Sequence, residues 1–209
     1  MIECSKLGSF VDGVDVAELF NPERFTGKAA SFGLLPGTSF DLRCGWNLSV
    51  EADRDRCWRQ LNEELPAFMV GSPLCAPFSN ALNMRGNVEE YKKSETYRLR
   101  LAEAVEHLTF CCRVYRWQVD RGCYFLHDHP WSASSWKLPL MKAMRAVKGV
   151  ELYCGDQCCF GQASKGPDGV KGLARKRTGW LTNSPCVGYA LQMRCKADRA
   201  DNTTPALEH

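Results

Sequence analysis

The chain has 209 residues, of which 44% are hydrophobic, 24% charged and 11% aromatic, and its formal net charge is +3. This length suits one ordinary domain, and this composition excludes a chain that is disordered throughout. No apolar run reaches the roughly 18 residues of a membrane span, no signal-peptide core begins the chain, and so small a charge does not require a nucleic-acid partner. We therefore expect an intracellular protein, nuclear or cytoplasmic, with one domain over 1–206. The last three residues, Leu207–His209, resemble the scar of a purification tag.

Twelve cysteines distinguish the chain from an average composition. In a small secreted protein such a number predicts a disulfide framework. Here Cys111 and Cys112 are adjacent in sequence, as are Cys158 and Cys159, and buried cysteines often behave as small hydrophobic residues. Because no signal peptide precedes them, we favour a reducing compartment in which most of the thiols are free.

Short apolar runs alternate with amphipathic segments along the chain. The apolar runs predict strands over 10–19, 39–42, 67–71, 123–127, 150–153 and 180–182. The segments between them predict helices over 22–33, 51–65, 94–121, 135–147 and 185–195. The helix over 94–121 has the clearest signal, because its apolar side chains recur at three- and four-residue spacing. The glycine-rich, basic stretch 161–177 predicts a flexible loop.

This alternation of strands and helices predicts an α/β fold, namely a Rossmann-like, mostly parallel sheet with helices on both faces. In such sheets ligands bind just beyond the carboxyl ends of the strands. The segments that follow three of the predicted strands contain Cys44–Asn47, Ser72–Ser79 and Asp128–Trp131. We therefore expect a functional site to be built from these segments.

Cys75 lies in a proline-bounded turn directly after the predicted strand 67–71. A cysteine in such a turn can be an exposed nucleophile, because nearby cations or backbone N–H groups favour the reactive thiolate. The alternative is an ordinary thiol, since one of twelve cysteines can fall at a strand end without any function.

His127, Asp128 and His129 alternate along a predicted strand, which places both histidines on one face and Asp128 on the other. The histidines could form half of a metal site completed by a cysteine, or they could hydrogen-bond to loops around the site. We favour the second interpretation, because the chain has no C-x-x-C pair and lacks the H-x-E and P-C-x-x-C motifs of zinc deaminases. We therefore expect no metal.

Arg175, Lys176 and Arg177 precede the last predicted strand. Such a charge run is usually solvated, but it can also contact a phosphate or a substrate carbonyl. Trp131 and Trp136 flank a serine-rich turn. Either ring could stack on a nucleobase or could pack within the protein.

Taken in chain order, these segments resemble the catalytic domain of the DNA cytosine-5 methyltransferases. The family's P-P-C-Q-x-F-S loop corresponds to Ser72–Ser79, its E-N-V motif puts Asp128 at the position of the acid, and its Q-x-R-x-R segment corresponds to Arg175–Arg177. The chain also looks like divergent domains of this kind in eukaryotic hypothetical proteins and mobile-element polyproteins, in which G-S-P-x-C-x-x-F-S and H-E-H-P recur. It departs from the family at Leu74, Ala76 and Asp128, and no glycine-rich loop follows its first strand.

The resemblance implies an S-adenosylmethionine-dependent methyltransferase that acts on C5 of cytosine in nucleic acid through a Cys75 thiolate. It implies that Asp128 holds or protonates N3 and that Arg175 or Arg177 stabilises the pyrimidine carbonyl. The residues it implies for cofactor binding are Phe20, Asn21, Asp41, Trp46, Asn47, Ser72 and Pro73. Those it implies for contact with a base flipped out of its stack are Ser79, His127, His129 and Trp131.

Two other functions stay open. The chain could be a catalytically inactive module with a methyltransferase fold that binds nucleic acid or protein. It could also be a hydrolase or transferase in which Cys75 works with His127 or His129, which requires an imidazole within hydrogen-bond reach of the thiol.

Overall fold

The centre of the computed structural model is a six-stranded sheet in the order β2-β1-β3-β4-β8-β5. The structure describes residues 13–79, 88–165 and 169–195. Neighbouring strands from β2 to β4 pair in parallel, and β8 pairs antiparallel with both β4 and β5. The strands span Val16–Leu19 (β1), Pro36–Phe40 (β2), Phe68–Gly71 (β3), Tyr124–Pro130 (β4), Glu151–Asp156 (β5) and Arg177–Thr182 (β8). The expected mostly parallel sheet is confirmed.

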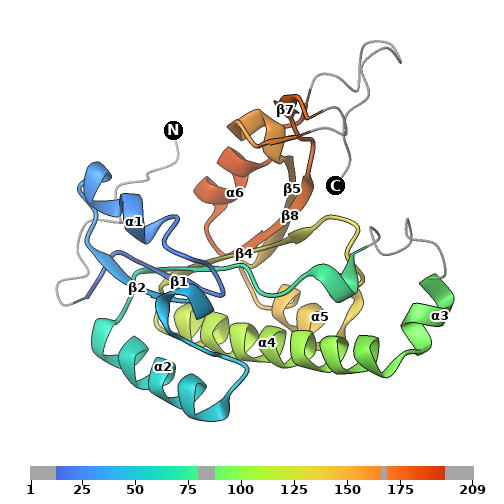
Figure 1. The fold of residues 1–209 in the computed structure, drawn as a ribbon. Coiled ribbons are helices and arrows are strands. Elements are labelled where there is room, and N and C mark those ends of the chain that lie inside the picture. Colours follow the sequence, from blue (N-terminus) through green and yellow to red (C-terminus); the bar gives the residue numbers. More distant parts are fainter. Residues whose placement is uncertain (1–12, 80–87, 166–168, 196–209) are drawn as a thin grey trace.

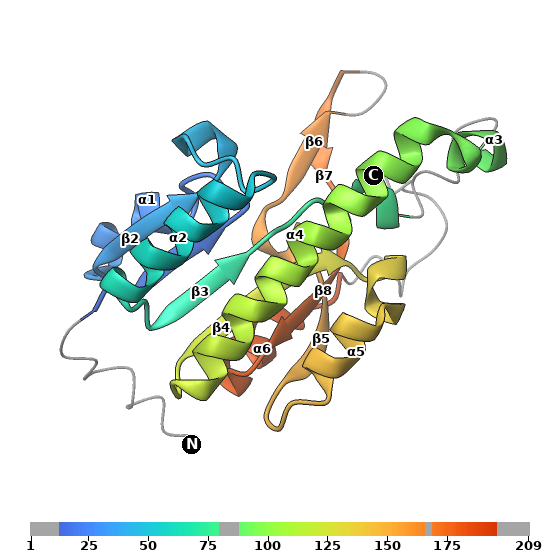
Figure 2. The same cartoon turned by 90° about the horizontal axis from the view of Figure 1, so that it is seen from below.

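Helices lie on both faces of this sheet, as predicted (Figure 1). One face carries α2 (Glu51–Glu64), α4 (Glu95–Asp120) and α5 (Pro139–Arg145), which lie in front of the strands in Figure 2. Of the helices in the described residues, the other face carries the short α1 (Thr26–Ala29) and α6 (Pro185–Leu191). The described residues form a single domain of the Rossmann-like α/β class.

The longest helix, α4, follows directly from local sequence signals. The Ser94 hydroxyl caps its first turn by accepting a hydrogen bond from the Tyr97 N–H at 3.2 Å. Its periodic apolar positions are buried against the sheet, and Leu108, Cys111 and Tyr115 are fully inaccessible to solvent. Gly122, with φ of 72°, follows the helix and allows the chain to turn into β4.

Two predicted segments differ from the structure in kind. The segment 22–33 contains only the four residues of α1 and the 3₁₀ turn η1 (Ala30–Phe32). The segment 161–177, predicted to be a flexible loop, includes a two-stranded hairpin of β6 (Ala163–Lys165) and β7 (Lys171–Leu173). Neither strand is apolar enough to produce an alternating pattern, so periodicity could not reveal the hairpin.

Other differences concern boundaries and one additional helix. β1 begins at Val16, and 10–12 of the strand predicted over 10–19 lie outside the described residues. β2 begins at Pro36, three residues before the predicted start. A short helix that we did not predict, α3 (Val88–Lys93), precedes α4. Among the described residues, no helix combines the length and the hydropathy that crossing a bilayer requires.

The strand order reverses at β1, because β2 lies on one side of it and β3 on the other. The chain segments that leave β1 and β3 therefore diverge, and a crevice opens between them at the carboxyl edge of the sheet. This switch point is the place where open α/β sheets bind their ligands.

Candidate active site

A cavity of about 690 Å³ lies at this switch point. It collects side chains from segments that are far apart in the sequence, namely the loops after β1 and β3, the end of β4 and the start of β8. Of the residues that the sequence singled out, those lining the cavity are Phe20, Asn21, Ser72, Pro73, Cys75 and Asp128. The tertiary structure therefore brings the predicted nucleophile, the predicted acid and part of the predicted cofactor contacts to one place.

Cys75 stands at the end of the loop that leaves β3. Its carbonyl accepts a hydrogen bond from the Phe78 N–H at 3.0 Å, which begins the 3₁₀ turn η3 (Ala76–Phe78). Pro77 and Phe78 are buried and anchor this turn. Burial raises the pKa of the Cys75 thiol, while the nearby Lys176 ammonium lowers it. The thiol is therefore protonated at neutral pH, with a cation in place to favour the thiolate.

Asp128 extends from β4 into the same cavity. Its carboxyl group accepts a hydrogen bond from the Ser72 hydroxyl, which joins the β3 loop to β4. Burial raises the pKa of Asp128, against the opposing effects of the Ser72 hydrogen bond and the Lys176 and Arg24 charges. A carboxyl group whose pKa is raised can remain protonated and donate a hydrogen bond to a ligand.

Lys176 is the residue of the basic triplet that lines the cavity, whereas the resemblance assigned the carbonyl contact to Arg175 or Arg177. Arg177 was predicted to contact a substrate carbonyl, but its Nε instead donates to Asp156 Oδ1 at 3.2 Å. Arg175 does not line the cavity either. Neighbouring residues of a strand point to opposite faces, so the pairing of Arg177 with the buried Asp156 leaves Lys176 for the cavity. The position of the two arginines outside the cavity lining does not support the role assigned to them.

His127 and His129 lie together on the other face of β4, as their alternation predicted. Both rings are fully buried, 4.7 Å apart, and burial lowers both pKa values, that of His129 to about 4. His127 Nδ1 pairs with the Tyr115 hydroxyl at 3.1 Å, and His129 Nδ1 pairs with the Ser135 hydroxyl at 2.7 Å. Neither ring lines the cavity, so the predicted substrate contacts of both histidines are not supported by position.

His129 instead contacts the loop after β3, which contains Cys75, from the opposite face of β4. Its Nε2 lies 3.3 Å from the Pro73 carbonyl oxygen, which it can reach as a donor. This contact confirms the interpretation that a histidine hydrogen-bonds to a loop around the site. None of the hydrogen bonds that the two rings make within the described structure involves Cys75, so a Cys–His pair is not formed.

The predicted ribose and adenine contacts are not brought to the cavity. Asp41 caps the 3₁₀ turn η2 (Leu42–Cys44) by accepting from the Arg43 N–H at 2.9 Å. The Arg56 guanidinium lies 3.9 Å over the Trp46 ring, and the Asn47 N–H donates to Asp53. These residues stabilise the connection between β2 and α2, so their predicted role in binding a cofactor is not supported by position.

The remaining predicted base contacts also lie elsewhere. Ser79 and Trp131 do not line the cavity, although the Trp131 side chain is 41% exposed. Trp136 is buried, and its indole N–H donates to the Pro130 carbonyl at 2.8 Å, so it packs within the core of the protein.

All cysteines in the described part of the chain are free, and no described group of three or more His, Cys, Asp or Glu side chains could hold a metal.

Glu18 is a residue of the site region that sequence reasoning missed. It is fully buried, and its Oε1 accepts hydrogen bonds from the backbone N–H groups of Arg24, Phe25 and Thr26 at 2.8–3.1 Å. Its Oε2 accepts from the Asn21 side chain. The carboxylate therefore holds the loop between β1 and α1 in one conformation, and a lone acidic residue in the apolar strand VAEL was the available signal.

Phe20 shows how this loop turns without the expected glycines. Its φ is 52°, in the left-handed region that bulky residues rarely adopt. Its ring lies against the His107 ring, with 4.4 Å between centroids, while part of the side chain lines the cavity. Strained backbone of this kind occurs often at ligand-binding sites, and here it coincides with the switch point.

Alkylation of Cys75 by iodoacetamide is expected to accelerate as the pH rises past the ordinary thiol pKa of about 8.5, because only the thiolate reacts. Lys176→Gln should slow it at each pH, since it removes the cation that lowers the pKa of Cys75. Mass spectrometry of the digested protein measures each cysteine separately. The half-buried Cys44, outside the cavity, is the internal control that Lys176→Gln should not affect. A Cys75 rate that is already constant above about pH 6 would contradict the raised pKa.

No protein-family model, no curated protein and no solved structure matches this chain. The arguments about its function therefore depend on the chemistry of the cavity and on the order of its motifs.

Proposed function

We propose that the chain is an S-adenosylmethionine-dependent methyltransferase-like domain that acts on C5 of cytosine in nucleic acid, with Cys75 as the nucleophile. The observation that carries the proposal is the convergence of Cys75, Asp128 and Lys176 on one cavity at the switch point of the sheet. The three residues come from the β3 loop, β4 and the start of β8, in the order in which the related motifs occur. A chance similarity of short motifs gives no reason for their side chains to meet.

The loop after β1 favours a cofactor without phosphate groups. Dinucleotide cofactors place a pyrophosphate on free N–H groups where a helix begins after the first strand. Here the Glu18 carboxylate already accepts hydrogen bonds from those N–H groups, including those of Phe25 and Thr26. The Glu18 carboxylate occupies the position where a cofactor phosphate would bind and would repel it. S-adenosylmethionine has no phosphate group to place there.

The residues that would hold S-adenosylmethionine are those of the predicted set that line the cavity, namely Phe20, Asn21, Ser72 and Pro73. Phe20 adds an apolar residue to the lining on which an adenine could pack, and Ser72 and Pro73 precede Cys75 in the same loop. The volume of about 690 Å³ lies within the range of roughly 300–1,000 Å³ that is usual for ligand pockets. When bound, the cofactor supplies an electrophilic methyl group.

The side chains of the cavity supply the other parts of the reaction. Cytosine C5 is a poor nucleophile, and addition of the Cys75 thiolate to C6 makes it enamine-like. Asp128 holds or protonates N3 as negative charge develops on the ring, and the Lys176 side chain donates a hydrogen bond to the carbonyl oxygen O2. Methyl transfer to C5 would release S-adenosylhomocysteine. Removal of the C5 proton by a base would then let the C6–S bond break, with its electron pair returning to the Cys75 sulfur and the N3 proton returning to Asp128.

We expect the cytosine to belong to a nucleic acid because of the shape and the charge of the cavity. Cys75 and Asp128 lie within a cavity, and neither C6 nor N3 of a stacked, paired cytosine can enter it. The base must therefore leave its stack. Arg24 and Lys176 line the cavity and give it the positive charge that attracts a phosphate backbone.

Two features favour the second candidate, an inactive module with the same fold. The raised pKa of Cys75 leaves little thiolate at neutral pH, and the predicted contacts Asp41, Trp46 and Asn47 lie outside the cavity. Such a module would bind nucleic acid or protein without turnover. Cofactor binding separates the two candidates.

Titration calorimetry with S-adenosylmethionine and S-adenosylhomocysteine, combined with thermal melting, tests the proposal. At a hundredfold excess over its dissociation constant, a ligand of the native state adds about 2.7 kcal/mol and raises the melting temperature by roughly 5–10 °C. Transfer of a labelled methyl group to single- and double-stranded DNA and RNA then identifies the substrate. The absence of binding by both cofactor forms would contradict the methyltransferase and favour the inactive module.

A further inference from the structure

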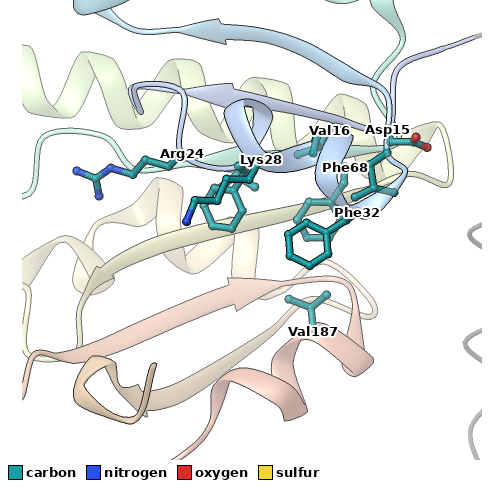
Figure 3. A pocket seen from close by; sticks show the side chains of 11 residues that line it. Asp15, Val16, Arg24, Lys28, Phe32, Phe68 and Val187 are labelled. Carbon is teal, nitrogen blue, oxygen red and sulfur yellow. The ribbon is translucent and has the colours of Figure 1, made fainter. Parts of the chain in front are cut away.

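A second cavity, of about 530 Å³, lies on the face of the sheet that carries α1 and α6 (Figure 3). Its walls are apolar side chains from β1, β3, α1, η1 and α6, including Val16, Ala29, Phe32, Phe68 and Val187. It shares Arg24, Phe25 and Val70 with the candidate active site but extends away from Cys75 and Asp128.

The cavity exists because this face of the sheet is incompletely covered. Within the described part of the chain, the opposite face carries the 14-residue α2 and the 26-residue α4, whereas the helices on this face are the 4 residues of α1 and the 7 of α6. Large apolar side chains at its edge are left in water, among them Phe32 at 77% exposure and Leu34 at 44%. Apolar surface of this kind, gathered around a cavity, indicates a binding site more often than isolated exposed residues do.

The two ends of the cavity differ in charge. Arg24 and Lys28 lie at one end, and Asp15 lies at the other (Figure 3). Neither cation forms an ion pair with a carboxylate of the described residues. Asp15, in contrast, accepts a hydrogen bond from the Leu35 N–H at 2.7 Å. Lys28 is thus available to a ligand, and Arg24 adds a second positive charge that also acts on Asp128 in the neighbouring cavity, whereas the Asp15 carboxylate already accepts a hydrogen bond.

We propose that this cavity binds a small amphiphile with an anionic head group, such as a fatty carboxylate or an alkyl phosphate. The apolar body lies over Val16 and Phe68, between Phe32 and Val187, and the head group lies at Arg24 and Lys28. The polarity of the cavity fixes this direction, because an anionic head would be repelled from the end that holds Asp15. The volume of about 530 Å³ lies within the usual range for small ligands, roughly 300–1,000 Å³.

This site goes beyond the proposed methyltransferase and can be tested separately. Lys28 and Val187 line only the apolar cavity, so their substitution leaves the walls of the candidate active site unchanged. Arg24 lines both cavities and is for that reason unsuitable as the principal variant.

The test is calorimetric titration of the full chain with dodecanoate, dodecyl phosphate and dodecylammonium, each below its micelle concentration. We expect saturable binding of the two anions, at one molecule per chain, and at least tenfold weaker binding of the cation. Lys28→Gln should weaken anion binding about tenfold, the size expected for loss of one charged contact. Lys142→Gln, an exposed lysine of α5 on the opposite face, is the matched control and should change nothing.

Two further variants test the apolar part. Val187→Trp should fill the cavity and abolish binding of all three amphiphiles, and circular dichroism checks that it folds. Phe32→Asp, at a position that is 77% exposed and so dispensable for folding, should also weaken binding. Equal affinity for anion and cation, or no saturable binding, would overturn the proposal. Binding only to vesicles that contain phosphatidylglycerol, and not to free amphiphiles, would also overturn it, because the surface would then be a membrane contact.

Discussion

Cys75→Ser is expected to lower methyl transfer by at least about 10³-fold, equivalent to about 4 kcal/mol of transition-state stabilisation. A serine hydroxyl has a far higher pKa than a thiol, so it cannot add to C6 at a useful rate. Single-turnover transfer of a labelled methyl group to the nucleic-acid substrate measures the change. The rate of this variant separates nucleophilic catalysis from a merely structural role of the thiol.

The same substitution should leave the fold and cofactor binding almost unchanged. Cys75 is only partly buried, and a serine hydroxyl is close in size to the thiol that it replaces. Its free energy of unfolding should therefore change by no more than about 0.5 kcal/mol. Cys44→Ser, at another half-buried thiol, is the matched control and should keep full activity. Normal turnover by Cys75→Ser would remove the thiolate mechanism.

Glu18→Ala is expected to lower the free energy of unfolding by about 3 kcal/mol or more, because it leaves four donors, two of them buried, without their acceptor. Those donors are the backbone N–H groups of Arg24, Phe25 and Thr26, together with the Thr26 hydroxyl. Urea unfolding followed by circular dichroism measures the loss. Because the loop after β1 forms one wall of the candidate site, cofactor binding should weaken as well.

Glu18→Gln distinguishes hydrogen bonding from charge at this position. The glutamine oxygen can accept the same bonds from the backbone, and its NH₂ group can meet the Asn21 amide after that amide rotates. We therefore expect a loss of only about 1 kcal/mol, the usual net value of one hydrogen bond. Equal losses for Ala and Gln would contradict the idea that the carboxylate acts as an acceptor for the loop.

The role of Glu18 also explains why the loop after β1 differs from a glycine-rich cofactor loop. A glycine loop exposes its backbone N–H groups to a ligand, whereas here an internal carboxylate satisfies them. The chain makes the turn at Phe20 with a positive φ instead of at a glycine. The loop is therefore determined by interactions within the protein, and a cofactor would bind beside it.

Much of the fold could be predicted from the sequence, because the signals involved are local. The long helix α4 has a serine cap, a periodic apolar stripe and a glycine after its end, all within one continuous segment. β3 and β4 are apolar runs whose ends are marked by turn residues. In contrast, the hairpin of β6 and β7 and the short α1 depend on contacts that no local period records.

For the candidate site, the sequence by itself determined which residue types follow which strands. It placed Cys75 after β3 and Asp128 on β4, and alternation alone put His127 and His129 on the opposite face of that strand. These inferences succeeded because the direction of a side chain on a strand depends only on its position along the chain.

Only the tertiary structure decided which cation of the basic triplet lines the cavity and which of the predicted loops lie outside it. Arg177 pairs with Asp156 because β5 and β8 are neighbours in register, and this leaves Lys176 to line the cavity beside Cys75. Asp41 follows a strand end, yet it caps its own 3₁₀ turn and does not reach the cavity. The pairing of strands and the path of a loop depend on packing between segments that are distant in sequence. Neither the Arg177–Asp156 pair nor the position of the Asp41 loop could therefore be read from local sequence patterns.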